Sequence, residues 1–348
     1  MTKTLLVTGG AGFIGSNFCR YVLGKHPDYR VVVLDALTYA GNLSTIADLQ
    51  SDPAMADRFR FYPGKIQDET VVNGVLKAEK IDFIVNFAAE SHNDRSILDP
   101  GSFIQTDVYG VFVLLDATRN HNVERLLHVS TDEVYGTIDD GQFTEQSPLE
   151  PNTPYSASKA GGEFQVRAHR ATYGTPSLIT RCGNNFGPFQ YPEKLIPFFV
   201  SRLIDDKMAP LYGSGMQVRD WVYVMDHCSA IDFILHHGVL GEAYNVGSDC
   251  EWPNIEITRK LLALLGKPES LIKPIGDPRG GAHDKRYSID ATKLKSLGWK
   301  PAYSFEAALD STVRWYVDNQ AWWRDITATE GYRAFVKRFY GQYLGEDL

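Results

Sequence analysis

A glycine-rich turn lies between an apolar run and an amphipathic segment near the start of the chain. Leu5–Val7 has the composition of a buried strand, and Ile14–Leu23 carries apolar residues at helical spacing. Gly9, Gly12 and Gly15 supply the glycines of the turn. In a strand–turn–helix context, such glycines allow a tight turn and a close approach of backbone N–H groups to a pyrophosphate. The pattern predicts the first strand and helix of a dinucleotide-binding fold.

An acidic residue closes the second apolar run, Val31–Leu34. The residue is Asp35, and a carboxylate at this place can accept hydrogen bonds from both hydroxyls of a ribose. Its negative charge would repel a 2′-phosphate, so we expect NAD rather than NADP. The GxxGxxG spacing of the turn resembles that of the short-chain dehydrogenase/reductase superfamily.

Short apolar runs alternate with amphipathic segments over the first half of the chain. The further runs are Ile81–Phe87, Leu126–Val129 and Leu178–Thr180, and the helical segments are Asp68–Ala78 and Ile104–Arg119. This alternation is typical of a parallel sheet that helices cover on both faces. We predict an α/β fold, a Rossmann-like doubly wound parallel sheet with a smaller C-terminal α/β substrate-binding lobe.

The character of the sequence changes after about residue 187, where prolines become frequent and helical segments become shorter. We predict an NAD-binding Rossmann-type domain over residues 1–190, with a return segment at about 222–250. The ranges 191–221 and 251–348 are then expected to form the substrate-binding lobe.

Charge and cysteine content exclude several classes of protein. The 348 residues carry 35 Lys and Arg against 43 Asp and Glu, a net charge of −8 without a basic block, so we expect no nucleic-acid partner. The four cysteines form no CxxC pair and indicate reduced core thiols, with no metal site and no disulfide framework. Apolar runs fall short of the roughly 20 residues that span a bilayer. We expect a cytoplasmic protein without a membrane partner.

Tyr155 and Lys159 lie at positions i and i+4, on one face of the segment if it is helical. A nearby ammonium favours the tyrosinate form and lowers a tyrosine pKa, which would make Tyr155 a general base near neutral pH. A Tyr and a Lys at this spacing are common by chance. They indicate this chemistry only in combination with a dinucleotide-binding turn and an upstream hydroxyl.

Thr131, Asp132 and Glu133 follow the Leu126–Val129 run, at the end of a predicted strand. Open α/β sheets bind ligands at the carboxyl ends of their strands. Two carboxyl groups at this edge could serve as an acid and a base on adjacent atoms of one substrate. The alternative is that Asp132 and Glu133 merely cap the next helix.

Motifs over almost the whole chain, from about residue 3 to about residue 325, resemble the dTDP-glucose 4,6-dehydratase family of extended short-chain dehydrogenases/reductases. The motifs are TGGAGFIGSN, LDALTYAGN, NFAAESHNDRSI, STDEVYG, YSASKAG, RCGNNFGPFQYPEKLIP and RDWVYVMDHCSAI. Related 4-epimerases have small or hydroxyl residues at the positions of Asp132 and Glu133.

The resemblance implies a lyase reaction with NAD. Tyr155, assisted by Thr131 and Lys159, would take the proton of the sugar O4 while C4 is oxidised. Glu133 would remove the C5 proton and Asp132, held protonated, would protonate the departing C6 hydroxyl. Return of the hydride to C6 gives a 4-keto-6-deoxy sugar, from which rhamnose and other deoxysugars are made.

The family motifs also imply the residues that hold the two ligands. For NAD they are Gly9, Gly12, Phe13, Ile14, Gly15, Asp35, Ala36, Leu37, Thr38, Lys65, Ile66, Ala88, Ala89, Ser91, Thr106, Tyr155, Lys159 and Asn185. For the sugar nucleotide they are Ser91, Thr131, Asn184, Lys194, Leu195, Pro210, Tyr212, Arg219, Asn245, Arg279, His283 and Tyr287. The family further implies a homodimer formed through a four-helix interface, with helices near 104–119 and 155–170.

Three departures from the family pattern leave alternatives open. Lys65 stands where the family has an Asp near the adenine, Asp107 replaces the usual Asn after Thr106, and the 279–284 segment is one residue longer. A UDP- or CDP-hexose 4,6-dehydratase is therefore the first alternative. A nucleotide-sugar 4-epimerase is less favoured, because Asp132 and Glu133 would have no task in it, and a non-enzymatic NAD-binding protein is least favoured.

Overall fold

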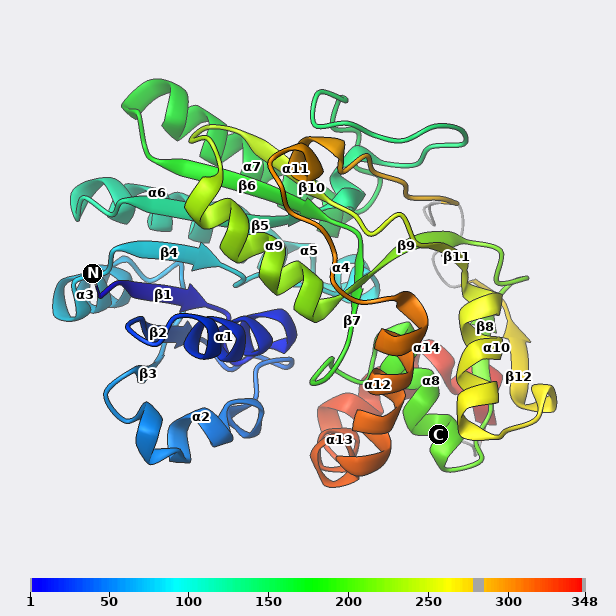
Figure 1. Cartoon of the computed structure of the whole chain (residues 1–348). Coiled ribbons are helices and arrows are strands. Elements are labelled where there is room, and N and C mark those ends of the chain that lie inside the picture. Colours follow the sequence, from blue (N-terminus) through cyan, green and yellow to red (C-terminus); the bar gives the residue numbers. More distant parts are fainter. Residues whose placement is uncertain (1, 278–284, 346–348) are drawn as a thin grey trace.

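The structure, a computed structural model, describes residues 2–277 and 285–345. Its centre is a sheet of seven parallel strands in the order β10-β6-β5-β4-β1-β2-β3 (Figure 1). The strands are β1 Thr4–Thr8, β2 Arg30–Asp35, β3 Phe59–Pro63, β4 Phe83–Asn86, β5 Arg125–Thr131, β6 Ser177–Cys182 and β10 Ala243–Val246. The order 3-2-1-4-5-6 is that of a doubly wound dinucleotide-binding fold, so the predicted fold class is confirmed.

Helices cover both faces of this sheet. On one face α1 (Phe13–Lys25) packs against α9 (Val224–His237). Every second residue of β1 and β2, among them Leu5 and Val7, points toward these two helices and fills the core beneath them. The second face is covered by α3 (Glu69–Glu79), α6 (Val111–Asn120) and α7 (Pro154–Tyr173). Strands buried on both faces explain why the apolar runs are nearly continuous in the sequence.

Two local features differ from the prediction. The edge strand β3 was not expected, because its residues are partly exposed and lack a continuous apolar run. The segment predicted as one helix over 104–119 begins with a π-helical turn, Ile104–Gly110, before α6 starts at Val111. The extra residue of such a turn re-aims a side chain, and here Asp107 points inward, where it accepts a hydrogen bond from Ser158.

Two small sheets and a group of helices form the right side of the molecule in Figure 1. Their strands are β7 Asn184–Phe186, β8 Ala209–Tyr212, β9 Val218–Tyr223, β11 Glu251–Pro253 and β12 Ile272–Ile275. Their helices are α8 Leu195–Ile204, α10 Asn254–Leu265, α12 Phe305–Asp318, α13 Gln320–Thr327 and α14 Glu330–Leu344. The short helices elsewhere are α2 Ala47–Ser51, α4 Asn93–Leu98, α5 Pro100–Phe103 and α11 Thr292–Ser296. The division of the chain into two domains at the expected boundaries stays a prediction.

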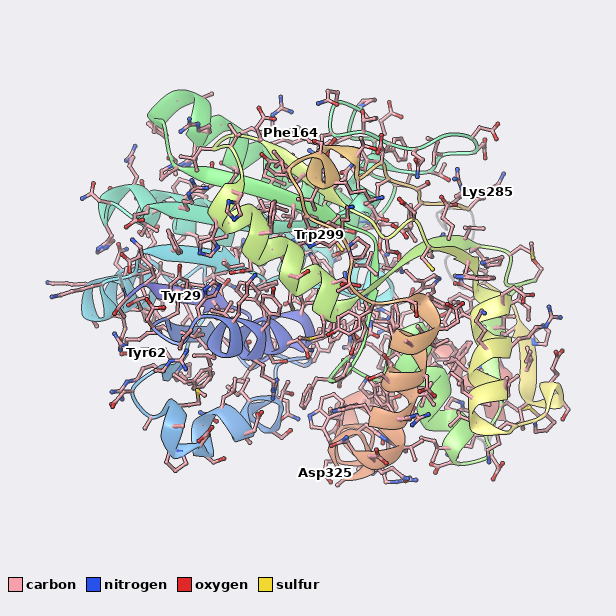
Figure 2. All side chains as sticks on the ribbon, in the orientation of Figure 1. Tyr29, Tyr62, Phe164, Lys285, Trp299 and Asp325 are labelled. Carbon is pink, nitrogen blue, oxygen red and sulfur yellow. The ribbon has the colours of Figure 1, made fainter. Side chains whose placement is uncertain are left out.

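Buried aromatic residues join these elements to the large sheet. Trp299, labelled in Figure 2, donates from its indole to Ser229 on α9 at 2.9 Å. Tyr316 on α12 is fully buried and donates to the backbone oxygen of Gln190. Indole and phenol groups can be buried in this way because each polar tip finds a partner. Within the described ranges, no helix has both the length and the apolar character needed to cross a membrane.

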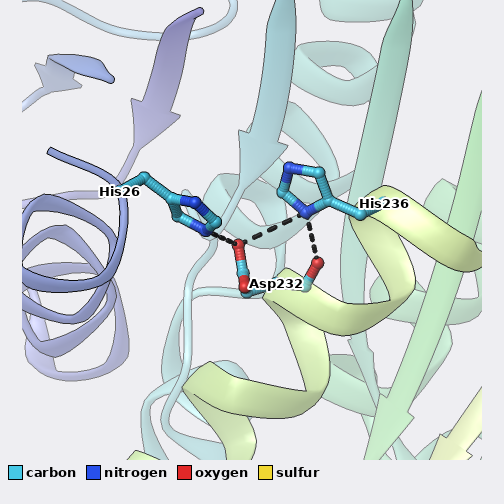
Figure 3. Close-up of side chains that lie close together, drawn as sticks. All are labelled: His26, Asp232 and His236. Atoms are coloured by element: carbon cyan, nitrogen blue, oxygen red, sulfur yellow. Dashed lines mark hydrogen bonds and ion pairs between the residues drawn. The ribbon is translucent and has the colours of Figure 1, made fainter. Parts of the chain in front are cut away.

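All four cysteines are free thiols, as expected, and three of them, Cys19, Cys182 and Cys228, are buried. One group of metal-type ligands also occurs among the described residues, at the ends of α1 and α9: His26, Asp232 and His236 (Figure 3). Its groups already have protein partners, because Asp232 pairs with Lys25 at 2.9 Å and with His26 at 2.9 Å. His236 donates from Nδ1 to the Asp232 backbone oxygen. The cluster therefore connects the two helices.

Candidate active site

A cleft of about 610 Å³ lies at the carboxyl ends of the central strands. Gly9 after β1, Asp35 at the end of β2, Ala88 after β4, Thr131 at the end of β5 and Gly183 after β6 all line it. Parallel strands direct their carboxyl ends to one edge of the sheet, which is where open α/β folds bind ligands. Motifs that are far apart in the sequence therefore lie next to one another along this edge of the sheet.

The glycine turn has no room for side chains. Gly9 has φ +68°, and a Cβ on it would lie 2.7 Å from the backbone nitrogen of Ala88. A Cβ on Gly15 would lie 2.4 Å from the Gly9 carbonyl oxygen. Gly12 is the N-cap of α1 and offers no side chain to its N–H groups. These open donors and the helix dipole fit a pyrophosphate.

Asp35 occupies the place expected for a ribose-binding carboxylate. Its Oδ2 accepts from the Ala11 N–H at 2.9 Å and its Oδ1 from the Leu37 N–H at 2.8 Å, which fixes its orientation. Burial raises the pKa of Asp35, and the two backbone hydrogen bonds oppose that shift. Leu37 is the one predicted NAD residue that does not line the cleft; the other predicted NAD residues all do. The residues present therefore fit a dinucleotide.

The threonine at the end of β5 starts a short 3₁₀ turn over Asp132–Tyr135. Thr131 is its N-cap, and its Oγ1 accepts from the Glu133 N–H at 3.2 Å. Neither carboxylate caps a helix, so the capping alternative for Asp132 and Glu133 is wrong. Both side chains instead line the cleft.

Asp132 has the environment of a carboxylic acid kept neutral. It is 2% exposed, and burial together with the nearby Glu133 charge raises its pKa well above the usual range. Its Oδ1 accepts from the Thr131 hydroxyl, whereas its buried Oδ2 has no hydrogen-bond partner within residues 2–277 and 285–345. The raised pKa favours the protonated carboxyl, and an Oδ2 without a protein partner is free to contact a ligand.

Tyr155 and Lys159 lie on α7, which begins with a capping box at Thr153. Lys159 is buried and Tyr155 is partly exposed, and Tyr155 is hydrogen-bonded to Thr131. The expected lowering of the tyrosine pKa is wrong: burial, with the charges of Glu133 and Asp107, raises the pKa of Tyr155 well above its usual range. Lys159 donates to the Val129 carbonyl at 2.7 Å, and burial lowers its pKa.

Asp107 lies behind Lys159 and is 1% exposed. Its Oδ1 accepts from the Glu90 N–H at 3.0 Å and its Oδ2 from the Ser158 hydroxyl at 2.7 Å. Burial raises the pKa of Asp107 to about 6, and burial together with Asp107 raises the pKa of Glu90 to about 7. The Asp107 charge in turn raises the pKa of Lys159 against the effect of burial.

The predicted sugar-nucleotide residues fall into two groups. Ser91, Thr131, Asn184 and Lys194 line the cleft, and Lys194 donates to the Ser91 carbonyl at 2.6 Å. Leu195, Pro210, Tyr212, Arg219, Asn245 and Tyr287 do not line it. Arg279 and His283 lie outside the described residues.

Members of the second group still contact the site or support it. The Arg219 guanidinium stacks on the Tyr287 ring, at 4.2 Å from its centroid. Tyr287 donates to Glu133 Oε2 at 3.4 Å, so this pair contacts a residue that lines the cleft. Asn245 is completely buried. Its amide accepts a hydrogen bond from Tyr135 and donates to two backbone oxygens, so its polar atoms bond to the protein itself.

Sequence reasoning missed several residues at this site. His227 lines the cleft; its Nδ1 donates to Asn185, burial lowers its pKa to about 3, and its Nε2 has no partner in the described part of the chain. Asn93 donates to Glu133 Oε2 at 2.6 Å. Both contacts join residues far apart in the chain, and no local spacing pattern signals them.

The fold and the site define a dinucleotide-dependent enzyme of the extended short-chain dehydrogenase/reductase type. A family model described as GDP-mannose 4,6 dehydratase matches residues 6–312. A dTDP-glucose 4,6-dehydratase of Xanthomonas campestris pv. campestris (strain B100) is 50% identical over 92% of this chain and 94% of the relative. The chain belongs to this family of sugar-nucleotide 4,6-dehydratases and, at this level of identity, to its dTDP-glucose 4,6-dehydratase members.

Solved structures agree with this assignment. The crystal structure of DesIV, a dTDP-glucose 4,6-dehydratase from Streptomyces venezuelae with NAD and TYD bound, is 49% identical and superimposes with a TM-score of 0.88. The match covers 93% of this chain and 99% of that one. A UDP-glucose 4-epimerase from Thermotoga maritima has the same fold, with a TM-score of 0.82, but is only 26% identical over 91% of this chain and 99% of the epimerase.

Proposed function

We propose that this chain converts dTDP-glucose into dTDP-4-keto-6-deoxyglucose and water, with NAD as its cofactor. The observation that carries the proposal is the position of Asp132 and Glu133, which share one cleft with Thr131, Tyr155 and Lys159. Thr131, Tyr155 and Lys159 suffice for oxidation and reduction at C4. An additional acid and base are what the removal of water requires. A 4-epimerase would have no use for them.

The glycine turn, Asp35 and the remaining cleft residues predicted for NAD would hold the dinucleotide. The bound cofactor would supply an acceptor for the C4 hydride and a donor for its return to C6. The described site supports this assignment through the space that the three glycines leave and through the orientation of the Asp35 carboxylate.

Oxidation at C4 requires removal of the O4 proton. Tyr155 is the group for this step, with Thr131 hydrogen-bonded to it and the Lys159 ammonium nearby on the same helical face. Tyr155 must be ionised to take the O4 proton, and burial together with the charges of Glu133 and Asp107 opposes this ionisation. Lys159, held by the Val129 carbonyl and facing Asp107, would then stabilise the tyrosinate.

Elimination uses the other two residues. The C4 ketone acidifies C5–H, and Glu133 takes this proton as the C5–H bond breaks. The C6–O bond breaks next, and the departing hydroxyl leaves as water with a proton from Asp132. After hydride addition at C6, Glu133 returns its proton to C5. The proton that Tyr155 took from O4 passes by way of solvent to Asp132, so that each group ends in the protonation state in which it began. The step requires a neutral Asp132, in agreement with the raised pKa of its buried carboxyl group.

The nucleotide specificity is tested by incubation of the purified chain with dTDP-, UDP- or CDP-glucose. The 4-keto-6-deoxy product is then measured by its absorbance after addition of alkali. We expect the largest signal with dTDP-glucose. A larger signal with UDP- or CDP-glucose would replace the substrate and keep the reaction, whereas glucose–galactose interconversion without loss of water would support an epimerase.

We also propose the site assignments, the domain boundaries and the cytoplasmic location given above.

We further propose a homodimer. It is supported by apolar side chains that remain exposed on the π-helical segment and on α7, which pack against each other: Ile104 is 56%, Tyr109 41% and Phe164 51% exposed. Figure 2 shows Phe164 on the outer face of α7. Exposed apolar side chains grouped on two adjacent helices are typical of an interface between copies.

A further inference from the structure

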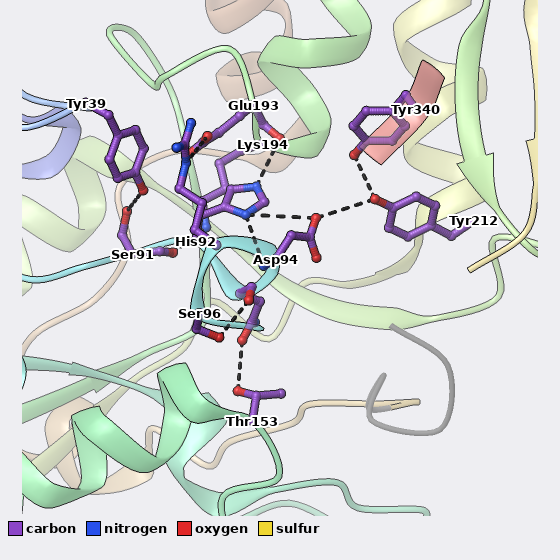
Figure 4. A network of polar contacts seen from close by, with 12 residues as sticks. Tyr39, Ser91, His92, Asp94, Ser96, Thr153, Glu193, Lys194, Tyr212 and Tyr340 are labelled. Atoms are coloured by element: carbon purple, nitrogen blue, oxygen red, sulfur yellow. Dashed lines mark hydrogen bonds and ion pairs between the residues drawn. The ribbon is translucent and has the colours of Figure 1, made fainter. Parts of the chain in front are cut away.

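Asn93 is the first residue of α4, a short helix that follows the carboxyl end of β4. The N-cap of this helix is His92, whose ring accepts from the Asp94 N–H, so the Asn93 amide has no capping task. The residue is buried. Figure 4 shows the surroundings of this turn, with Ser96, Asp94 and His92 on the segment and Thr153 facing it.

The Asn93 amide connects two parts of the catalytic site. Its Nδ2 donates to Glu133 Oε2 at 2.6 Å, and its Oδ1 accepts from the Thr153 hydroxyl at 2.8 Å. Thr153 is the N-cap of α7, and its Oγ1 also accepts from the Ser156 N–H. Reversal of the amide would place two acceptor oxygens, Asn93 Oδ1 and Glu133 Oε2, against each other, so only one orientation satisfies both contacts.

The bridge fixes Glu133 relative to the oxidation pair, because α7 carries Tyr155 and Lys159. Glu133 Oε2 accepts from Asn93 and from Tyr287, at 2.6 and 3.4 Å. Its other oxygen, Oε1, accepts no hydrogen bond from residues 2–277 and 285–345. Two donors on one oxygen thus leave the second oxygen as the one that can take a proton.

We propose that Asn93 is a positioning residue for elimination: its amide ties the Glu133 carboxylate to the N-cap of α7 and directs Oε1 toward the C5 proton of the substrate. The inference rests on the proposed function, in which Glu133 is the base. Oxidation at C4 does not use Glu133, so the loss of the bridge should affect the second half of the reaction and spare the first. A residue that only packs α4 against α7 would affect both halves alike.

The test compares Asn93→Leu with the wild-type protein and with Ser96→Ala. Leucine keeps the volume and removes both hydrogen bonds, whereas Ser96→Ala disturbs the same turn, where Ser96 donates to the Asn93 backbone oxygen, without removing a contact to Glu133. Single-turnover reactions with dTDP-glucose follow reduced cofactor by its absorbance, keto product by alkali, and deuterium uptake at C5 from heavy water. Thermal unfolding of each variant shows whether it folds.

For Asn93→Leu we expect product formation and C5 exchange to fall about 10- to 100-fold, because a misplacement of about 1 Å in a reacting group can cost about 100-fold. Reduced cofactor should form at close to the wild-type rate and accumulate. Asn93→Asp keeps the shape and loses the donor, so it should give the same result if the leucine variant does not fold. Ser96→Ala should stay within about 3-fold of wild type in every readout.

Equal slowing of both half-reactions, or no effect in either Asn93 variant, would overturn the role of Asn93. A failure of the proposed function looks different, because the wild-type protein itself would then form neither keto product nor reduced cofactor from dTDP-glucose.

Discussion

At the scale of single residues, burial and neighbouring charge determine which groups of this site can act as acids or bases. Asp132 and Tyr155 both have raised pKa values because their side chains are desolvated, with Glu133 contributing to both shifts. This raised pKa favours the protonated form of Asp132, which is the form that the proposed proton donation requires. For Lys159, burial lowers the pKa of the ammonium, and the charge of the buried Asp107 carboxylate opposes that shift.

Asp107→Asn tests the electrostatic coupling behind the catalytic pair. The Asp107 charge raises the pKa of Lys159 and the pKa of Tyr155, so its removal lowers both. A lower Tyr155 pKa moves the acidic limb of the activity profile to lower pH, and a lower Lys159 pKa moves the alkaline limb the same way. We expect the whole profile of kcat against pH to shift toward lower pH.

The control is Asp116→Asn on the exposed face of α6, whose carboxylate bonds Arg119. Its profile should match that of the wild-type protein. A profile of Asp107→Asn that stays in place or moves to higher pH would show that the Asp107 charge does not act on the pair.

The residues proposed as catalytic could be named from the sequence, but the environment of their side chains could not. Thr131, Asp132, Glu133, Tyr155 and Lys159 lie in two short motifs, and strand ends at one sheet edge bring these motifs together. The predicted direction of the Tyr155 pKa shift was wrong, because the i, i+4 spacing reveals that Lys159 is a neighbour but does not reveal how strongly the tyrosine is desolvated. The Asn93 bridge joins residues 93, 133 and 153, a contact that only the folded chain reveals.

At the scale of elements, the first helix depends on where its glycines lie. Gly15 and Gly24 are both in α1, but a Cβ on Gly15 would meet the Gly9 carbonyl at 2.4 Å, whereas a Cβ on Gly24 meets nothing within 4 Å. The same substitution therefore has opposite consequences at the two ends of one helix.

Gly15→Ala should displace the N-terminus of α1 from the turn, weaken NAD binding by at least about 10-fold and lower the melting temperature. Gly24→Ala should leave NAD binding unchanged and stabilise the protein by about 0.5–1 kcal/mol, because alanine has the better helix propensity. Fluorescence titration with NAD and thermal unfolding measure both. Equal NAD affinity in the two variants would contradict the role given to the turn.

The elements of the central sheet were predictable where the chain is buried on both faces. Partly exposed segments were harder: β3 at the sheet edge has no continuous apolar run, and the π-helical turn at 104–110 looks like ordinary helix in the sequence. Asp107 lies within this π-helical segment and accepts a hydrogen bond from Ser158 on α7.

At the scale of the whole molecule, the large sheet and the C-terminal elements share one hydrophobic cluster, which extends from Val7 in β1 to Leu344 in α14. Polar contacts cross the same boundary near the cleft, among them Arg95 with Glu193 at 3.0 Å. The two parts therefore position one site together. The change in composition after about residue 187 indicated a smaller C-terminal lobe, but it could not show how that lobe packs against the sheet.

Phe164→Asp tests the proposed dimer. A charge at the centre of an apolar interface cannot be desolvated without a partner, so the variant should sediment as a monomer at micromolar concentration while the wild-type protein sediments as a dimer. The control, Leu264→Asp on α10, changes a side chain that is 42% exposed and lies away from α7. A dimeric Phe164→Asp variant would place the interface elsewhere.

In the proposed reaction, one cleft oxidises C4, removes water across C5 and C6, and returns the same hydride to C6. The most direct test is incubation of the purified chain with dTDP-glucose carrying deuterium at C4, followed by NMR and mass analysis of the product. We predict a product lighter by one molecule of water, a ketone at C4 and the deuterium at C6. Deuterium that stays at C4, or that appears in a product retaining all its oxygen atoms, would contradict the account.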